Sequence, residues 1–316
     1  MRAYLLRRVL LAVPTLLGVS LLAFALANLA PGDPAEELLR RSTGYQPTPE
    51  EIASAREDLG LDRPIAVQYA SWLADAARGD LGTSYGTRRP VTDEIVERIP
   101  RTLELAVPAA LAALVLALAL GMVSAVHRNR WPDQVVRVIS VAGASMPSFW
   151  LALLLIVLFS LKLSVLPVAG REAGVRSLVL PVVALTLPPM AVLARFTRSA
   201  MLETLGEEYV RTARAKGLAG WRVVARHAFR NACIPIVTAF GTSLGHLVSG
   251  AVIIETIFLW PGVGKLAVDA ILQRDYPMIQ GFTLYAGLAF VLLNLLVDLS
   301  YGALDPRIRL TRAATA

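Results

Sequence analysis

Residues able to do covalent or metal chemistry are few and widely spaced in this chain. It has three histidines and one cysteine among 316 residues. It contains no His-Glu-x-x-His helix pattern and no Gly-x-Ser-x-Gly turn, so neither a zinc peptidase nor a serine hydrolase is indicated. Cys233 alone permits neither an internal disulfide nor a thiolate metal cluster. We therefore predict a chain that is not an enzyme and has no catalytic residues.

One stretch superficially resembles a phosphate-binding loop. Gly262-Val-Gly-Lys265 contains the Gly-Lys pair of such loops. Leu259 and Leu266 occupy the positions where the loop requires glycine and then Ser or Thr. We therefore reject an ATP site in this loop and predict that the chain binds no cofactor of its own.

The most regular pattern of polar side chains lies in the segment Arg195–Arg230, which is rich in bases. Within it, residues 207–216 begin with acids and end with bases, and Gly217 follows as a stop signal. This spacing predicts a short helix that carries a positively charged surface. A second short helical pattern covers residues 221–230.

The elements around this segment are apolar and long. The chain is 55% hydrophobic and 17% charged, whereas soluble domains carry about a quarter charged residues. Crossing the hydrocarbon core takes roughly 20 apolar residues in a helix. Six segments meet that requirement: Val9–Ala30, Leu103–Val126, Val135–Leu161, Leu178–Phe196, Cys233–Phe258 and Gly281–Ala303. We predict an all-α polytopic membrane protein with six transmembrane helices.

Orientation follows from the distribution of Lys and Arg. With a cytoplasmic N-terminus, the inside segments hold most of the bases, including the whole of Arg195–Arg230. The two short outside loops hold only Lys162, Arg171, Arg176, Lys265 and Arg274. This asymmetry is the one that the positive-inside rule predicts. We expect both termini in the cytoplasm of a bacterial cell, with the chain in its inner membrane.

The predicted organisation has four parts. Residues 1–30 form an N-terminal transmembrane helix, because the apolar run is longer than that of a signal peptide. Residues 31–100 are polar and form a small external subdomain, with one helix starting at Thr48-Pro-Glu-Glu51 and ending at Gly60, and another over 67–77. Residues 101–303 form a five-helix core that includes the cytoplasmic loop 195–230. Residues 304–316 form a cytoplasmic tail.

Several polar residues fall within the predicted spans and are candidates for lining a pathway, because ionisable groups in a membrane are costly to retain. They are Ser243, His246, Ser249, Glu255, Asn294 and Asp298. His246 would touch a metal ion only transiently, since one histidine is no metal site; a neutral histidine bonded to a neighbouring helix is the simpler interpretation. Asp298 lies at a depth where Arg137 would be its partner. No metal site is predicted.

Against this background, Glu208-Tyr-Val-Arg-Thr-Ala-Arg-Ala-Lys-Gly217-Leu resembles the cytoplasmic "EAA" loop of binding-protein-dependent ABC importer permeases. Gly217 fits the glycine of that loop and Ala213 its second alanine. Arg211 stands where glutamate is usual, Thr212 where the first alanine is, and Phe229-Arg230 where Leu-Pro is. These departures are typical of the dipeptide, oligopeptide and nickel permease branch.

Other motifs of that branch follow in order along the chain. They are Pro31-Gly-Asp-Pro34, Asp80-Leu-Gly-Thr-Ser84, Ser145-Met-Pro-Ser-Phe-Trp150, Trp260-Pro-Gly-Val-Gly264, Arg274-Asp-Tyr-Pro277 and Leu304-Asp-Pro-Arg307. Three further stretches look most like nickel-import permeases: Thr48-Pro-Glu50, Arg89-Pro-Val91 and Ile253-Ile-Glu-Thr-Ile-Phe258. The resemblance thus covers nearly the whole chain and favours the nickel branch slightly.

The resemblance implies a type I importer permease fold, a coupling helix that docks on an ATPase, and a set of partners. These are a homologous second permease subunit, two ATP-binding cassette ATPases that carry the ATP and magnesium, and an extracytoplasmic solute-binding protein. No nucleic acid is implied. The coupling residues would be Glu208, Tyr209, Arg211, Thr212, Ala213, Arg214, Ala215, Lys216, Gly217 and Leu218. From the sequence alone, we expect the apolar face of this coupling segment to consist of Tyr209, Ala213, Ala215 and Leu218.

Two alternatives remain open at this stage. A self-sufficient secondary transporter or channel would be favoured by inverted repeats or by several intramembrane acids, neither of which is clear here. A membrane-anchored binding protein, with residues 31–100 as its active part, would leave five further spans without a role. The substrate also stays open among dipeptides, longer peptides, nickel and metal chelates.

Overall fold

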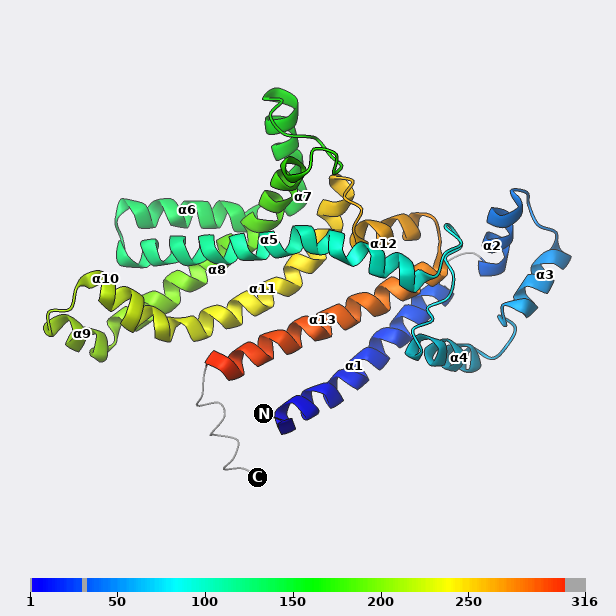
Figure 1. The fold of residues 1–316 in the computed structure, drawn as a ribbon, viewed down its shortest axis with the longest axis horizontal. Helices are drawn as coiled ribbons and strands as arrows, with labels where there is room; N and C mark the ends of the chain where they lie inside the picture. Colours follow the sequence, from blue (N-terminus) through cyan, green and yellow to red (C-terminus); the bar gives the residue numbers. More distant parts are fainter. Residues whose placement is uncertain (1, 30–32, 305–316) are drawn as a thin grey trace. The chain divides into compact units, whose positions relative to one another are not determined.

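The computed structural model describes residues 2–29 and 33–304, and within them the side chains of all but residues 2–9, 26, 27, 29, 42, 246, 249 and 298–304. The described chain is helical throughout, and its only strand-like pairing is an isolated bridge between Thr83 and Pro90 (Figure 1). This confirms the predicted all-α fold class.

The helices follow one another along the chain with short connections. They are α1 (Arg2–Leu29), α2 (Pro34–Thr43), α3 (Pro49–Asp58), α4 (Ile65–Ala77), α5 (Val91–Val126), α6 (Trp131–Ser145), α7 (Ser148–Leu155), the π-helical turn η1 (Ile156–Lys162), α8 (Val175–Gly206), α9 (Glu208–Ala215), α10 (Gly220–Arg222), the π-helical turn η2 (Val223–Ala228), α11 (Phe229–Ile257), α12 (Val263–Leu272) and α13 (Tyr276–Leu304).

The chain divides into two compact units. Unit 1 contains Thr102–Trp260 and the described residues from Leu292 on. Unit 2 contains Arg2–Arg101 and Pro261–Val291. The polar segment 31–100 therefore packs in one unit with α1, α12 and the first part of α13.

Three described helices are long and apolar enough to cross a membrane: α5, α8 and residues 276–297 of α13. Two further spans are each formed by a pair of helical segments with a bend between them. One pair is Trp131–Ser145 with Ser148–Lys162, and the other is Gly220–Gly245 with Gly250–Ile257. If each bent pair is counted as one span, the number rises to five. In α1 the corresponding apolar helix, Leu10–Ala25, is shorter. The side chains of α1 are described only in part, so the described residues neither confirm nor contradict the predicted number of six spans. The third predicted span, Val135–Leu161, is divided among α6, α7 and η1.

Proline explains the sharpest bend. The axis turns by 105° between α6 and the helix that follows it. Pro147 has no N–H to continue the backbone hydrogen bonds of the helix. It also disfavours a helical conformation at the preceding residue, Met146, which is extended at φ −84° and ψ 120°. By contrast, α8 continues through Pro181, Pro188 and Pro189. A membrane helix tolerates proline where the surroundings satisfy the freed backbone groups.

Glycines set the close packing within unit 1. A Cβ on Gly121 of α5 would lie 2.5 Å from the Cβ of Thr197 in α8. A Cβ on Gly143 of α6 would lie 3.0 Å from that of Ala191, also in α8. Small residues let helix backbones approach in this way. Buried Ala113, Ala117, Ala191 and Ala194 belong to the same core cluster, so α5, α6 and α8 pack closely.

The local signals in residues 31–100 are confirmed. Thr48 and Glu51 form a reciprocal capping box at the start of α3, and Gly60 follows its end with φ +66°. The predicted amphipathic helix over 67–77 is α4, which starts two residues earlier. Helix α5 begins well before the predicted span at Leu103, because Val91 and Ile95 are buried in the core of unit 2.

Candidate functional site

The predicted coupling helix is α9, and two apolar side chains hold it in place. Val210 is fully buried and Ala213 nearly so, in a cluster with Val223 of η2 and with Leu205 at the end of α8. Tyr209 adds a polar link, since its hydroxyl accepts a hydrogen bond of 2.7 Å from Asn231 Nδ2 in α11. The helix therefore rests on the elements before and after it in the sequence.

The remaining predicted coupling residues point outward. Glu208, Tyr209, Arg211, Thr212, Arg214, Ala215, Lys216, Gly217 and Leu218 are all exposed. Ala213 is the exception: it was predicted to belong to the exposed apolar face, but it lies on the side that packs against η2. The open surface of α9 is therefore basic, with Arg211, Arg214 and Lys216 around a smaller apolar part.

Gly217 ends this helix by its backbone conformation. Its φ of +73° lies in the left-handed region, which side chains rarely adopt. No atom lies within 4 Å of the place where a Cβ would stand. The requirement for glycine is therefore conformational rather than one of space. The N–H of Gly217 bonds the carbonyl of Arg214 at 2.9 Å and closes the last turn.

The helix that leads into α9 is tied to two other helices by a buried carboxylate. Asp133, in the first turn of α6, has no exposed side-chain surface. Arg198 of α8 donates to it from Nε at 2.7 Å and from Nη2 at 2.8 Å. Ser124 Oγ of α5 and the backbone N–H of Asn129 complete its hydrogen bonds. We call these four residues the Asp133 cluster.

The Asp133 cluster lies at the same end of unit 1 as α9. Figure 1 shows the turn between α5 and α6 at the end of α8 where α9 and α10 are also found. The cluster therefore fixes α8 to α5 and α6 shortly before the chain enters α9. Sequence reasoning missed it and instead matched Arg137 with Asp298, whose side chain lies outside the described residues. The available signal was an acid in the first turn of α6 and an arginine within the apolar α8.

The structure describes the side chains of three of the six predicted pathway residues. Ser243 is buried, donates to the carbonyl of Ala239 at 2.9 Å and borders a cavity. Glu255 is fully buried within unit 1, whereas Asn294 is exposed on α13. The side chains of His246, Ser249 and Asp298 lie outside the described part of the chain. Of the three candidates whose side chains are described, Ser243 is the one that borders this cavity.

That cavity has a volume of about 360 Å³ and lies in unit 1. Its wall comes from α6, α7, α8 and α11, with Ala144, Ser148, Leu185, Pro188, Ser243 and Gly250 among the lining residues. None of the lining side chains that the structure describes is charged. Such a wall offers two hydroxyls and apolar surface, which suits weak contact with a passing solute better than tight binding.

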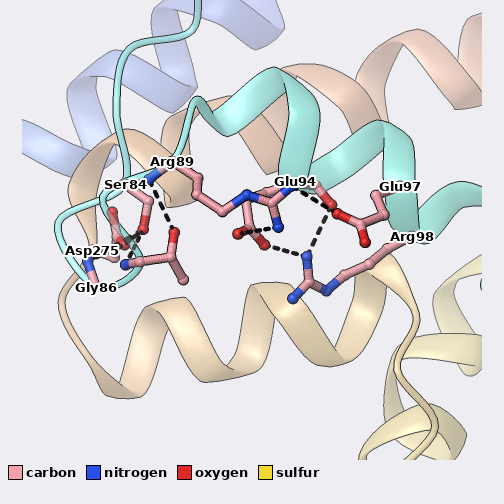
Figure 2. Close-up of polar contacts among 8 residues, drawn as sticks. Ser84, Gly86, Arg89, Glu94, Glu97, Arg98 and Asp275 are labelled. Atoms are coloured by element: carbon pink, nitrogen blue, oxygen red, sulfur yellow. Dashed lines mark hydrogen bonds and ion pairs between the residues drawn. The ribbon is translucent and has the colours of Figure 1, made fainter.

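A second set of polar contacts stiffens unit 2 (Figure 2). Asp275, which is buried, accepts hydrogen bonds from Ser84 Oγ at 2.5 Å and from the N–H of Gly86 at 3.1 Å. Glu94 is also buried and pairs with Arg89 and Arg98. Arg89 reaches Glu97 as well, at 2.9 Å. The motifs around Ser84 and Asp275, distant in sequence, thus form one polar network.

No group of three or more His, Cys, Asp or Glu side chains that could hold a metal ion occurs among the described residues. The described candidate site consists of a short helix with an exposed basic surface, a weakly polar cavity and two buried polar networks.

Two family models match the chain. The one described as "Binding-protein-dependent transport system inner membrane component" matches residues 117–310. A second, for the N-terminal part of such membrane components, matches residues 1–106.

Curated relatives match along almost the whole length. A di/tripeptide transport system permease protein of Pseudomonas aeruginosa is 44% identical, over 98% of this chain and 99% of the relative. A glutathione transport system permease protein of Salmonella typhi is 43% identical, over 97% of this chain and 98% of the relative.

Two solved structures share the fold. One is the MetNI methionine ABC transporter in an inward-facing conformation, with a TM-score of 0.58 and 19% identity, covering 67% of this chain and 96% of the other. The other is an amino acid ABC transporter with histidines, with a TM-score of 0.55 and 14% identity, covering 67% and 94%.

The Asp133 cluster generates a stability prediction. Replacing Asp133 with alanine leaves Arg198, whose side chain is only 23% exposed, without its counter-charge. Removing one partner of a buried pair destabilises a protein by about 3–5 kcal/mol. We expect Asp133→Ala to lower the thermal stability of the purified chain in detergent, measured by the loss of its monodisperse chromatographic peak on heating.

The double variant Asp133→Leu with Arg198→Leu is the control, because it removes both charges together. It should recover part of the loss, since an apolar pair of similar volume is often no worse than the ion pair. Equal stability of Asp133→Ala and the unaltered chain would show that the cluster does not hold these helices.

Proposed function

This chain belongs to the family of binding-protein-dependent transport system inner membrane components, and on that premise we propose how it takes part in transport. It is the permease subunit of an ATP-driven importer. Together with a homologous permease subunit it forms the translocation pathway, of which it supplies half. The observation that carries the proposal is the exposed basic surface of α9, because such a surface is suited to docking on a partner protein.

We propose that α9 docks on one of two separate ATPase subunits, which hold the ATP and magnesium. The basic residues of α9 suit an acidic or mixed groove, and Tyr209 and Leu218 supply apolar contact at its edges. The chain itself carries out no hydrolysis. A solute-binding protein delivers the solute on the opposite side of the membrane.

The proposed motion passes from α9 to the helices around the cavity. When ATP closes the ATPase subunits, α9 moves with the groove that holds it. Val210 and Ala213 carry this motion to η2, and Arg198 carries it through Asp133 to α5 and α6. The α5–α6–α8 block then rocks as one body and opens the pathway to the other side, and hydrolysis resets it.

Peptides are the proposed substrate class. The relatives are named for di/tripeptides and for glutathione, which is itself a small peptide. The uncharged cavity wall with two serine hydroxyls is compatible with solutes of varied side chains. Three sequence motifs suggest a preference for nickel, which stays a prediction. Transport of metal chelates in place of the free ion is a variant of that prediction.

The proposed location is a bacterial inner membrane, with both termini in the cytoplasm. To test the orientation, Lys216→Cys is placed in a Cys233→Ser background, which leaves one thiol in the chain. We expect no labelling of intact cells by a membrane-impermeant maleimide and full labelling after permeabilisation. A matched Lys162→Cys variant, in the predicted outside loop, should label in intact cells. Labelling of position 216 from outside would contradict docking on a cytoplasmic ATPase.

Gly217 tests the coupling role. A β-branched residue in the left-handed conformation costs about 1–2 kcal/mol, so Gly217→Val should distort the end of α9. In proteoliposomes of the full complex we expect ATP hydrolysis to continue while solute uptake falls by roughly tenfold. Gly220→Ala is the control, because it lies in the same loop with open space around it and no positive φ. Unchanged uptake by Gly217→Val would count against docking through α9.

Substrate and energy source are tested together. Cells that express the chain with its partner subunits should take up a labelled dipeptide in an ATP-dependent way, and excess glutathione should compete. Labelled nickel uptake that peptides do not reduce would instead favour the nickel branch. The lone chain in liposomes should transport nothing, and solute flux through it without ATP would support a self-sufficient transporter or channel.

A further inference from the structure

The turn between α5 and α6 exposes two arginines that the coupling role does not use. We call residues 127–130 the α5–α6 turn. Arg128 and Arg130 are both exposed, and neither forms an ion pair within the part of the chain that the structure describes. The nearest acid in the sequence, Asp133, has no exposed side-chain surface and is held by Arg198. The charges that the turn itself exposes are therefore all positive.

Hydrogen bonds fix the backbone of this turn. The N–H of Asn129 donates to Asp133 Oδ2 at 2.9 Å, and the N–H of Arg130 donates to the carbonyl of His127 at 2.9 Å. Asn129 has a φ of +64°, in the left-handed region that asparagine adopts more readily than most residues. The buried carboxylate thus holds the turn from inside the unit, and the two arginines start from fixed positions on either side of Asn129.

Exposed apolar side chains reach almost to the turn along both of its helices. The apolar part of α5, Leu103–Val126, is roughly 36 Å long at ~1.5 Å per residue, slightly more than the ~30 Å of hydrocarbon that it would cross. Val123 and Val126 are exposed near its end, and Val135 and Val138 are exposed on α6. The exposed apolar surface therefore stops at the turn, which places the turn at the boundary between hydrocarbon and headgroups.

The residue that follows the turn marks the same boundary independently. Trp131 is 75% exposed at the start of α6, although tryptophan is highly buried on average. Membrane proteins enrich exposed tryptophan at the interface, where the ring meets hydrocarbon and the N–H meets water or headgroups. Val135 and Val138 lie four and seven residues further on and share its face of the helix. The ring of Trp131 therefore ends an apolar surface at the level of the arginines.

The charge of the turn selects among headgroups. A guanidinium binds two phosphate oxygens at once, so Arg128 and Arg130 match phosphate groups. A zwitterionic headgroup also carries a cation beside its phosphate, and the turn exposes no acid of its own to receive that cation. An anionic headgroup brings no cation, and bases at a membrane surface attract such lipids. Charge complementarity therefore favours the anionic class.

We propose that the α5–α6 turn binds the headgroup phosphate of an anionic phospholipid through Arg128 and Arg130, with Trp131 seated beside it at the edge of the hydrocarbon. The apolar surfaces that flank the turn on both helices favour a lipid over the acidic surface of a protein. The proposal rests on the location of the chain in a membrane and does not depend on the docking of α9.

The first test measures which lipid the full transporter complex retains. The complex is reconstituted in nanodiscs of equal parts phosphatidylethanolamine and phosphatidylglycerol, released into detergent, and analysed for bound lipid by native mass spectrometry. We expect phosphatidylglycerol to be enriched. Arg128→Gln and Arg130→Gln should each lower this enrichment about fivefold, because each removes one base from the membrane surface, and the double variant should lower it further.

Matched variants separate this site from the rest of the chain. Arg88→Gln makes the same change at an exposed arginine of unit 2 and should leave the enrichment unaltered. Gly217→Val should also retain lipid normally, so the lipid proposal and the docking of α9 fail separately. Enrichment of phosphatidylethanolamine, or undiminished phosphatidylglycerol in the double variant, would overturn the proposal. Loss of the ATPase subunits from the double variant with lipid unchanged would assign the turn to the ATPase and overturn it as well.

The second test measures the depth of Trp131. Nanodiscs are prepared with lipid that carries a nitroxide quencher either at the headgroup or near the end of an acyl chain. The fluorescence that Trp131→Phe removes from the complex is the signal of this residue. We expect the headgroup nitroxide to quench that signal more strongly than the acyl-chain nitroxide. A signal that neither nitroxide quenches would place the ring away from the bilayer and contradict the proposal.

Discussion

The buried carboxylate of Asp133 is the interaction on which the arrangement of unit 1 depends. A charge removed from water must be matched by partners that replace its hydration. Here the partners come from two other helices and a turn, so satisfying the carboxylate of α6 fixes α5, α6 and α8 together. The glycine contacts at Gly121 and Gly143 hold the same three helices close along their length. Helix α9 follows directly from α8, one of these three helices.

The helix that follows this block, α9, depends on its neighbours for stability. Helix α9 has only two buried side chains, Val210 and Ala213, and would be marginal alone because isolated short helices are unstable in water. Its stability comes from packing on η2 and Leu205. Helix α9 is thus attached to α8 and η2, and η2 continues into α11, which borders the cavity. The described side chains of the cavity wall are uncharged.

Unit 2 is organised by a different principle, in which polar networks take the place of a large apolar core. Asp275 gathers the Ser84 loop, and Glu94 gathers two arginines. Aromatic contacts between Phe24, Tyr69 and Trp72 then attach α4 to α1. These contacts hold together a unit that includes most of α1 and the first part of α13. Both units thus contain buried carboxylates that are held by partners from distant parts of the chain.

The sequence alone determined whatever depends on neighbours in the chain. Apolar length predicted where the spanning helices lie, and local caps predicted the limits of α3 and α9, because these signals act within a few residues. The tertiary structure decided the rest. Asp133 and Arg198 are 65 positions apart, so no local pattern could pair them. Ala213 faces inward because it packs in a cluster with Val223 and Leu205. The third span bends by 105° where Pro147 interrupts the helix. The α5–α6 turn likewise exposes only positive charge once Arg198 of a distant helix holds Asp133 inside the unit.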